Sequence, residues 1–262
     1  MERTYENRFA DRIDLDENLA LTFEERASGS VLIRLYGKAE ERTLTLDAKA
    51  YSYVKIFVKN ETDHASRLVV KSTVKNDAKI QMGLLDLEDA PLEIKLDGNL
   101  IEQGATMEFS TAMLCLTSQN KKLDLELSSR TDHTYGNMHN FAVVFDRGQY
   151  EAVAAGRIVK GAWGSESHQE TRVLTMGKDH KCLALPILYI DENDVKASHA
   201  LTVGQPDADQ LYYLQSRGLS TPQAVGLLSI GYFKPVLSLV DDEDLRRQLE
   251  EEMESRVGMY EH

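Results

Sequence analysis

The sequence has too few cysteines to support a disulfide-stabilised fold. The chain of 262 residues contains only Cys115 and Cys182, which lie far apart in the sequence. It begins Met-Glu-Arg-Thr-Tyr-Glu-Asn, without the apolar core of a secretory signal peptide. Two free thiols are typical of a protein in a reducing compartment, so we expect a cytoplasmic location.

Long hydrophobic runs are also missing. A membrane-spanning helix needs roughly 20 apolar residues, and no run in this sequence approaches that length. The longest candidate extends from Ala224 to Phe233, contains two glycines and is followed by Lys234-Pro235. We therefore predict a buried helix at this position and no membrane association.

Basic residues are outnumbered, with 30 Lys and Arg against 43 Asp and Glu, which gives a formal net charge of −13 at pH 7. This balance argues against a nucleic-acid partner, because nonspecific binding needs clustered Lys and Arg. Much of the excess is local, since the stretch from Asp241 to Arg256 has eight acidic residues and three arginines. We interpret this stretch as a solvated helix face.

The standard signatures of enzymes are absent as well. The sequence has no glycine-rich phosphate loop, Gly-x-Ser-x-Gly elbow, His-Glu-x-x-His or Cys-x-x-Cys motif. Asp132-His133 and His139-Asn140 contain metal-ligating side chains, but their six-residue spacing matches no known metal site. We interpret them as ordinary turn histidines, and we expect the protein not to be an enzyme.

What the sequence has in abundance is the period-two alternation of β-strands. It is clearest in Lys122–Leu127, where leucines alternate with charged residues. Tyr51–Val58 and Arg67–Val74 are rich in β-branched and aromatic residues, and polar turn clusters separate such runs. We expect no helix from about residue 25 to about residue 200.

The strands alone do not choose among a sandwich, a barrel and a solenoid. Asp97-Gly98 is the one tight-hairpin dipeptide of this type, and its rarity favours parallel coils over an antiparallel meander. The absence of a fixed-period repeat argues in the opposite direction. The architecture therefore stays open at this point.

The C-terminal part is helical in pattern. A first helix is predicted to begin at Pro206-Asp207 and to end at Gly218. A second is predicted to begin at Thr221-Pro222, with the Thr221 hydroxyl as the cap and Pro222 at the first helical position.

A third helix is predicted to begin in the acidic cluster 241–244, which suits the positive end of a helix dipole. Its apolar residues recur every four positions, at Leu245, Leu249, Met253 and Val257. Such a stripe is more often packed in a core than exposed to a partner.

The segment from Pro186 to Gly218 carries a specific order of motifs. An apolar strand after Pro186 is followed by Asp194-Val195-Lys196-Ala197-Ser198-His199, then by Thr202-Val203-Gly204, an acidic helix and Ser216-Arg217-Gly218. This order resembles the SufB/SufD family of iron–sulfur cluster assembly proteins, and SufD more than SufB.

The resemblance extends upstream more weakly, to about residue 130. Its supporting residues are Asp146–Tyr150, Gly156–Ile158 and Gln169.

The resemblance implies a mainly β fold, namely a right-handed parallel β-helix followed by a small helical C-terminal domain. It implies an N-terminal segment at residues 1–24, a β-helix core at 25–204 and helices at 205–262. It also implies a scaffold that works with a SufC-like ABC-type ATPase, bound by the C-terminal helices. The β-helix would pair with a second copy or with a SufB-like paralogue.

The family histidine of the Ser-His motif falls on His199, and Cys182 lies just before the Pro186 strand, where SufB-like chains also have a cysteine. The resemblance thus implies that His199 and Cys182 are ligands of a transient iron–sulfur cluster, as imidazole and thiolate both bind iron. Val173 stands at the sulfur-accepting position, and Ala200 stands where SufB has a glutamate. Cys182 is otherwise interpreted as a small buried hydrophobic residue.

Two other functions remain as alternatives. One is a structural adaptor that holds the ATPase and binds no cluster, which the scarcity of cysteine favours. The other is a carbohydrate-active enzyme on a parallel β-helix. That enzyme needs a cleft of clustered carboxylates and normally carries a secretion signal.

Overall fold

The computed structural model describes residues 1–117 and 119–258, which form sixteen strands and three helices. The strands are β1 Glu2–Tyr5, β2 Arg8–Leu15, β3 Leu19–Phe23, β4 Ser28–Leu35, β5 Glu41–Ala48, β6 Tyr53–Asn60, β7 Ser66–Val74, β8 Lys79–Asp86, β9 Leu92–Leu100, β10 Thr106–Cys115, β11 Asn120–Ser129, β12 Tyr135–Val144, β13 Gln149–Ile158, β14 Glu166–Thr175, β15 Lys181–Ile190 and β16 Lys196–Gly204. The helices are α1 Ala208–Ser216, α2 Thr221–Leu237 and α3 Glu243–Gly258.

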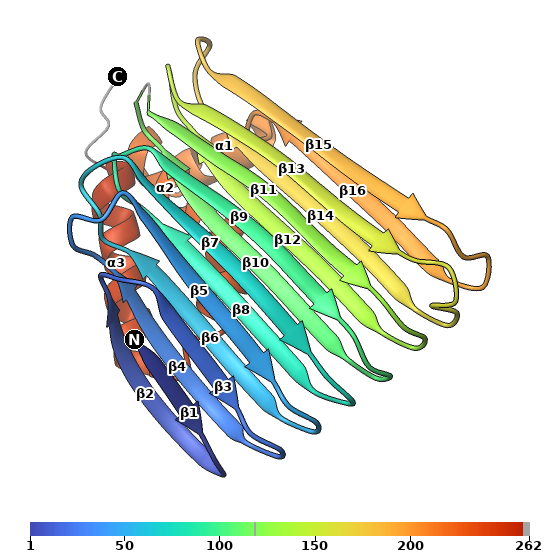
Figure 1. The fold of residues 1–262 in the computed structure, drawn as a ribbon. Coiled ribbons are helices and arrows are strands. Elements are labelled where there is room, and N and C mark those ends of the chain that lie inside the picture. Colours follow the sequence, from blue (N-terminus) through green and yellow to red (C-terminus); the bar gives the residue numbers. More distant parts are fainter. Residues whose placement is uncertain (118, 259–262) are drawn as a thin grey trace.

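Consecutive strands alternate between two parallel sheets. The odd-numbered strands form one eight-stranded sheet in the order β1 to β15, and the even-numbered strands form the other, from β2 to β16. Each coil therefore contributes one strand to each sheet, and the coils stack along one axis (Figure 1). The predicted parallel β-helix followed by C-terminal helices is confirmed.

The coils lengthen along the chain, which explains why no fixed repeat was found. Glu2 lies opposite Ala20 in the ladder, 18 residues later, whereas Gln149 lies opposite Lys181, 32 residues later. One corner of successive coils nonetheless repeats a residue with a left-handed backbone conformation followed by a small buried residue. The left-handed residues are Arg26, Tyr51, Asp77, Gly104, His133 and Gly164.

Alternation places the apolar side chains between the two sheets. In β11, Leu123, Leu125 and Leu127 are at most 2% exposed, while the charged residues between them point outwards. Each such leucine contributes about 1.5–3 kcal/mol of hydrophobic stabilisation. The interior of the coils is thus a continuous apolar core.

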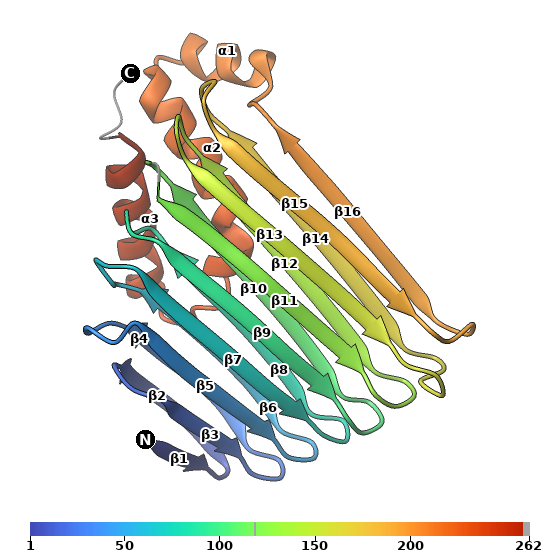
Figure 2. The same cartoon turned by 45° about the horizontal axis from the view of Figure 1, so that its top comes forward.

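The helices α2 and α3 pack on the outer face of the even-numbered sheet (Figure 2). At Gly83 of β8 a Cβ atom would lie 2.6 Å from Leu239 Cδ1. The glycine therefore lets Leu239, just after the end of α2, approach β8 closely. In α3, Leu249, Met253 and Val257 are at most 2% exposed. The prediction that this stripe belongs to a core is confirmed.

The acidic stretch of α3 is only partly a solvated face. Glu252 pairs with Lys59 at 2.7 Å, and residues 241 and 242 just before the helix pair with Lys55 and Arg12 of the solenoid at 2.7 and 2.9 Å. The interpretation as a solvated helix face agrees with the exposure of Glu243, Asp244, Glu251 and Glu254, whereas the three residues above also pair with basic side chains of the solenoid.

The helix boundaries agree with the predictions except in one place. Asp207 caps α1, and Gly218 has a positive φ of 94° after its end. The cap of α2 is Ser220 rather than Thr221, because Ser220 and Gln223 form a reciprocal capping box. The apolar run 224–233 lies within α2, and no helix among the described residues has the length and apolarity needed to cross a membrane.

Strand pairing extends into the segment 1–24 that the sequence analysis set apart from the β-helix. β1 pairs with β3, and β2 pairs with β4, within the same two sheets. β1 and β3 have only four and five residues, so each offers little alternation from which a strand could be predicted. How the chain divides into domains stays a prediction, and residues 259–262 of the expected helical domain lie outside the described residues.

Candidate functional site at the last coil

The last coil consists of two edge strands. Within the described residues, β15 pairs only with β13, and β16 pairs only with β14, so each has one edge of unpaired backbone groups. The same strands expose large apolar side chains, and Leu183, Leu185 and Val203 are 54, 48 and 46% exposed. Unpaired strand edges combined with exposed apolar side chains favour association with another chain.

Cys182 is the second residue of β15 and lies opposite Tyr150 of β13. It is half-buried and packs against the interior core. This burial raises the pKa of the Cys182 thiol, because a thiolate is poorly solvated there. Cys115 is fully buried and its pKa is raised for the same reason. Both thiols are free.

His199 lies in the middle of β16, opposite Gln169 of β14, and it is exposed. Register partners in a parallel ladder point to the same face, so His199 follows Gln169 towards the interior side of the coil. Gln169 Nε2 donates to the backbone oxygen of Ile187 at 2.6 Å, whereas its buried Oε1 accepts no hydrogen bond from the described residues. An unsatisfied buried acceptor costs about 1–3 kcal/mol.

Within one chain, Cys182 and His199 lie at different positions along the direction of the strands. Gln169, the neighbour of His199, reaches Ile187, which lies five residues or roughly 16 Å along β15 from Cys182. No group of three or more His, Cys, Asp or Glu in the described part of the chain is arranged to hold a metal ion. The assignment of both residues as cluster ligands stays a prediction.

The other candidate metal ligands do not converge. His133 lies in a corner turn, with Nδ1 3.0 Å from Asp132 Oδ2 and its ring 4.4 Å from that of Trp163. His139 is on the outer face of β12, whereas Asn140 is fully buried on the opposite face. The interpretation of both as turn histidines was right for His133 and wrong for His139, which lies within β12, because the alternation of that strand continues through it.

The sequence analysis missed an exposed aromatic patch on the first helix. Tyr212 and Tyr213 of α1 are 73 and 56% exposed, and Leu227 of α2 is 49% exposed. The sequence contained a signal for this exposure, namely the helical spacing of Leu211 and Leu214, which are the residues of this helix that turn inwards. The tyrosines between them therefore face away.

Taken together, the two stacked parallel sheets and the helices that cover one of them define a parallel β-solenoid protein with a helical C-terminal cover. A family model described as the SufBD core domain of SUF system FeS cluster assembly matches residues 12–232. The chain belongs to this SufBD family, as the resemblance implied.

Curated relatives give the same result. SufD of Bacillus subtilis is 30% identical over 181 residues, which is 69% of this chain and 41% of that protein. SufD of Escherichia coli is 29% identical over 107 residues, covering 41% of this chain and 25% of the relative. The chloroplastic protein ABCI7 of Arabidopsis thaliana is 28% identical over 144 residues, covering 54 and 30%. The chain thus spans less than half the length of each of these relatives.

Proposed function

We propose that this chain is a non-enzymatic scaffold of SUF-type iron–sulfur cluster assembly that acts in the cytoplasm. The observation that carries the proposal is the family match over residues 12–232, which includes almost all coils of the solenoid and most of α2. The two free thiols support a reducing compartment.

The scaffold pairs with a second copy through its last coil. The support is the combination of two unpaired strand edges with exposed Leu183, Leu185 and Val203. A closed dimer requires an isologous contact, in which both copies use the same surface of the last coil. A SufB-like paralogue with a similar edge would compete for the same surface.

The cluster is the cargo of this interface, held by His199 and Cys182 from each copy. Two thiolates and two imidazoles are a known ligand set for a two-iron centre. An antiparallel contact between the two copies supports this ligand set. In such a contact, Cys182 near the start of β15 in one copy lies opposite later strand residues of the other copy. Gln169 is the positioning residue of this proposal: its Oε1, which has no donor among the described residues of the single chain, would accept the ring N–H of His199 in the assembled dimer and leave the other ring nitrogen for iron.

The helical segment binds a SufC-like ATPase through α1 and the exposed face of α2. The support is the exposure of Tyr212, Tyr213 and Leu227. The stripe of α3 is not available to a partner, because Leu249 and Met253 are buried against the solenoid.

Anaerobic reconstitution with iron and sulfide tests the scaffold function. The wild-type chain is expected to retain iron and sulfide, and His199→Ala and Cys182→Ser should each retain several-fold less while remaining dimeric. His133→Ala, at the distant corner, is the matched control and should retain the wild-type amount. Unchanged iron in both ligand variants, or none in the wild type, would leave the adaptor function in its place.

Two point variants separate partner binding from folding. Tyr212→Ala and Tyr213→Ala together should weaken binding of the ATPase at least tenfold, as expected when exposed aromatic anchors are removed. Arg247→Ala on the outer face of α3 is the control. Deletion of residues 206–262 would be a poor substitute, because it would uncover the apolar face on which α2 and α3 pack. Full-strength binding by the double variant would exclude α1 as the contact.

A further inference from the structure

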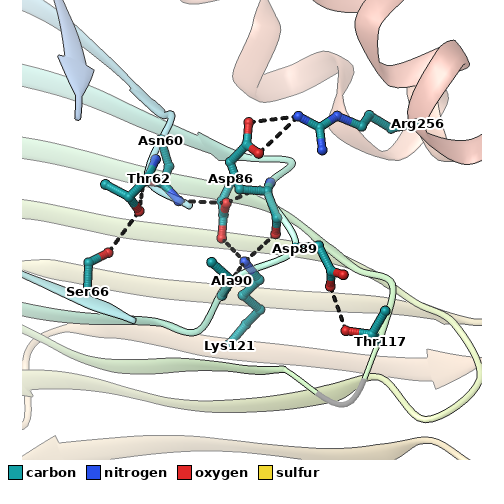
Figure 3. Close-up of polar contacts among 10 residues, drawn as sticks. Asn60, Thr62, Ser66, Asp86, Asp89, Ala90, Thr117, Lys121 and Arg256 are labelled. Atoms are coloured by element: carbon teal, nitrogen blue, oxygen red, sulfur yellow. Dashed lines mark hydrogen bonds and ion pairs between the residues drawn. The ribbon is translucent and has the colours of Figure 1, made fainter. Parts of the chain in front are cut away.

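The turn between β8 and β9, residues 87–91, lies between a buried ion pair and the C-terminal helix (Figure 3). The ion pair joins Lys121 Nζ to Asp86 Oδ2 at 2.6 Å, and the two side chains are 1 and 0% exposed. Lys121 directly precedes the alternating run of β11. It points inwards, whereas the adjacent Lys122 points outwards.

The turn supplies most of the other hydrogen bonds of this pair. Lys121 Nζ donates to the backbone oxygens of Glu88 and Ala90, at 2.7 and 2.6 Å. Asp86 Oδ1 accepts from the Glu88 backbone N–H at 3.1 Å and from Asn60 Nδ2 at 2.9 Å. Buried charges are tolerated only when further hydrogen bonds offset the loss of hydration. The ion pair therefore depends on the conformation of the turn.

The same turn is held from outside by α3. The carboxylate of Glu88 accepts two hydrogen bonds from Arg256 Nη2, both at 2.9 Å. Arg256 lies one residue before Val257, whose side chain is buried in the apolar cluster that the helices share with the even-numbered sheet. Glu88 thus contacts the interior pair through its backbone and the helix through its side chain.

We propose that the β8–β9 turn is a coupling element that links docking of α3 to the order of the buried Lys121–Asp86 pair. Docking of α3 fixes Glu88, and a fixed Glu88 backbone satisfies the pair. The coupling is reciprocal, so a change in the turn also weakens the docking of α3. It does not require the proposed function. If a partner moves the helices, the turn transmits that movement to the interior of the solenoid.

Hydrogen exchange of the native, full-length chain tests the coupling. Arg256→Ala is expected to speed exchange of the turn amides, Glu88 above all, by tenfold or more, because local opening no longer breaks the Arg256 bonds. Arg247→Ala is the matched control, since it removes an exposed ion pair with Asp244 within α3 and leaves the docking contacts of the helix in place. It should leave exchange of the turn amides at the wild-type rate.

The reciprocal variant is Glu88→Gln, which keeps the turn but removes the charge that Arg256 contacts. It should speed exchange of the Met253 and Val257 amides in α3. The coupling is wrong if Arg256→Ala leaves the turn as protected as in the wild type, or if Arg247→Ala speeds exchange of the turn equally. Both outcomes can be read without a partner or a cluster, so they are independent of the proposed function.

Discussion

The two ends of the solenoid differ in how the apolar core is covered. At the first coil the rings of Tyr5, Phe9 and Phe23 stack with centroids 4.4 to 5.7 Å apart. The hydroxyl of Tyr5 donates to Asp11, which also pairs with Arg3. The first coil therefore covers the end of the core with its own side chains.

The last coil has no comparable cover within the described residues. Its strands are longer, with ten residues in β15 against four in β1, and their apolar side chains face solvent. Solenoid proteins need a cap at each end, since each coil buries its apolar face only against a neighbour. This difference is the basis of the proposal that the chain closes one end and a partner closes the other.

The largest expected loss of stability comes from a substitution in the aromatic cluster at the start of the solenoid. Phe23 is fully buried, so Phe23→Ala should destabilise the fold by about 3–5 kcal/mol. Leu185→Ala at the last coil should cost less than about 1 kcal/mol in the monomer, because Leu185 is already half-exposed. Urea unfolding of both variants measures the difference. Equal losses would remove the distinction between the ends.

The two thiols compare the last coil, which holds Cys182, with the interior of the solenoid, which holds Cys115. Burial keeps both thiols protonated to a higher pH than a free cysteine, so alkylation of Cys182 should need a pH above the usual pKa of about 8.5. Because its folded-state pKa is raised, the stability that Cys182 contributes is present below this pH and is lost as the pH rises further.

Mass spectrometry after alkylation at several pH values distinguishes the two cysteines. Cys182 should react slowly in the folded chain, and Cys115 should react only on unfolding. Rapid alkylation of Cys115 in the native protein would contradict the closed interior.

The smallest effect concerns the turn between β15 and β16. Hydrogen bonds from the backbone N–H groups of Asn193 and Gly161 lower the pKa of Glu192 to about 2. A lowered pKa contributes stability above the unfolded-state value, which is lost as the pH falls towards 2. Glu192→Gln should thus lower the urea midpoint at pH 6 but not at pH 2. Glu254→Gln on α3 is the control, and a pH-independent difference for Glu192→Gln would refute the assignment.

The sequence predicted local structure better than architecture. Alternation located strands such as 122–127, and capping residues located the starts of the first two helices to within one residue. Alternation did not choose the fold, because the coils lengthen from 18 to 32 residues and hide the repeat. The resemblance made that choice, and the topology confirmed it.

The site was harder to predict than the fold. Sequence order did not show that Cys182 and His199 lie at different positions along the strands of the last coil, since that depends on the register of strand pairing. Nor did it separate Lys121, which is buried in an ion pair, from Lys122, which is not buried. Exposure of Tyr212 was foreseeable from the spacing of Leu211 and Leu214, the residues of α1 that turn inwards.

Sedimentation velocity of the intact chain tests most directly the claim that two copies associate through the last coil. The account predicts a dimer at micromolar concentrations that Leu185→Glu converts to a folded monomer, because a buried charge at the interface would be costly. Thr4→Glu, on the exposed face of β1 at the closed end, should leave the dimer unchanged. A wild-type chain that stays monomeric, or a dimer that Leu185→Glu does not disturb, would contradict association through the last coil.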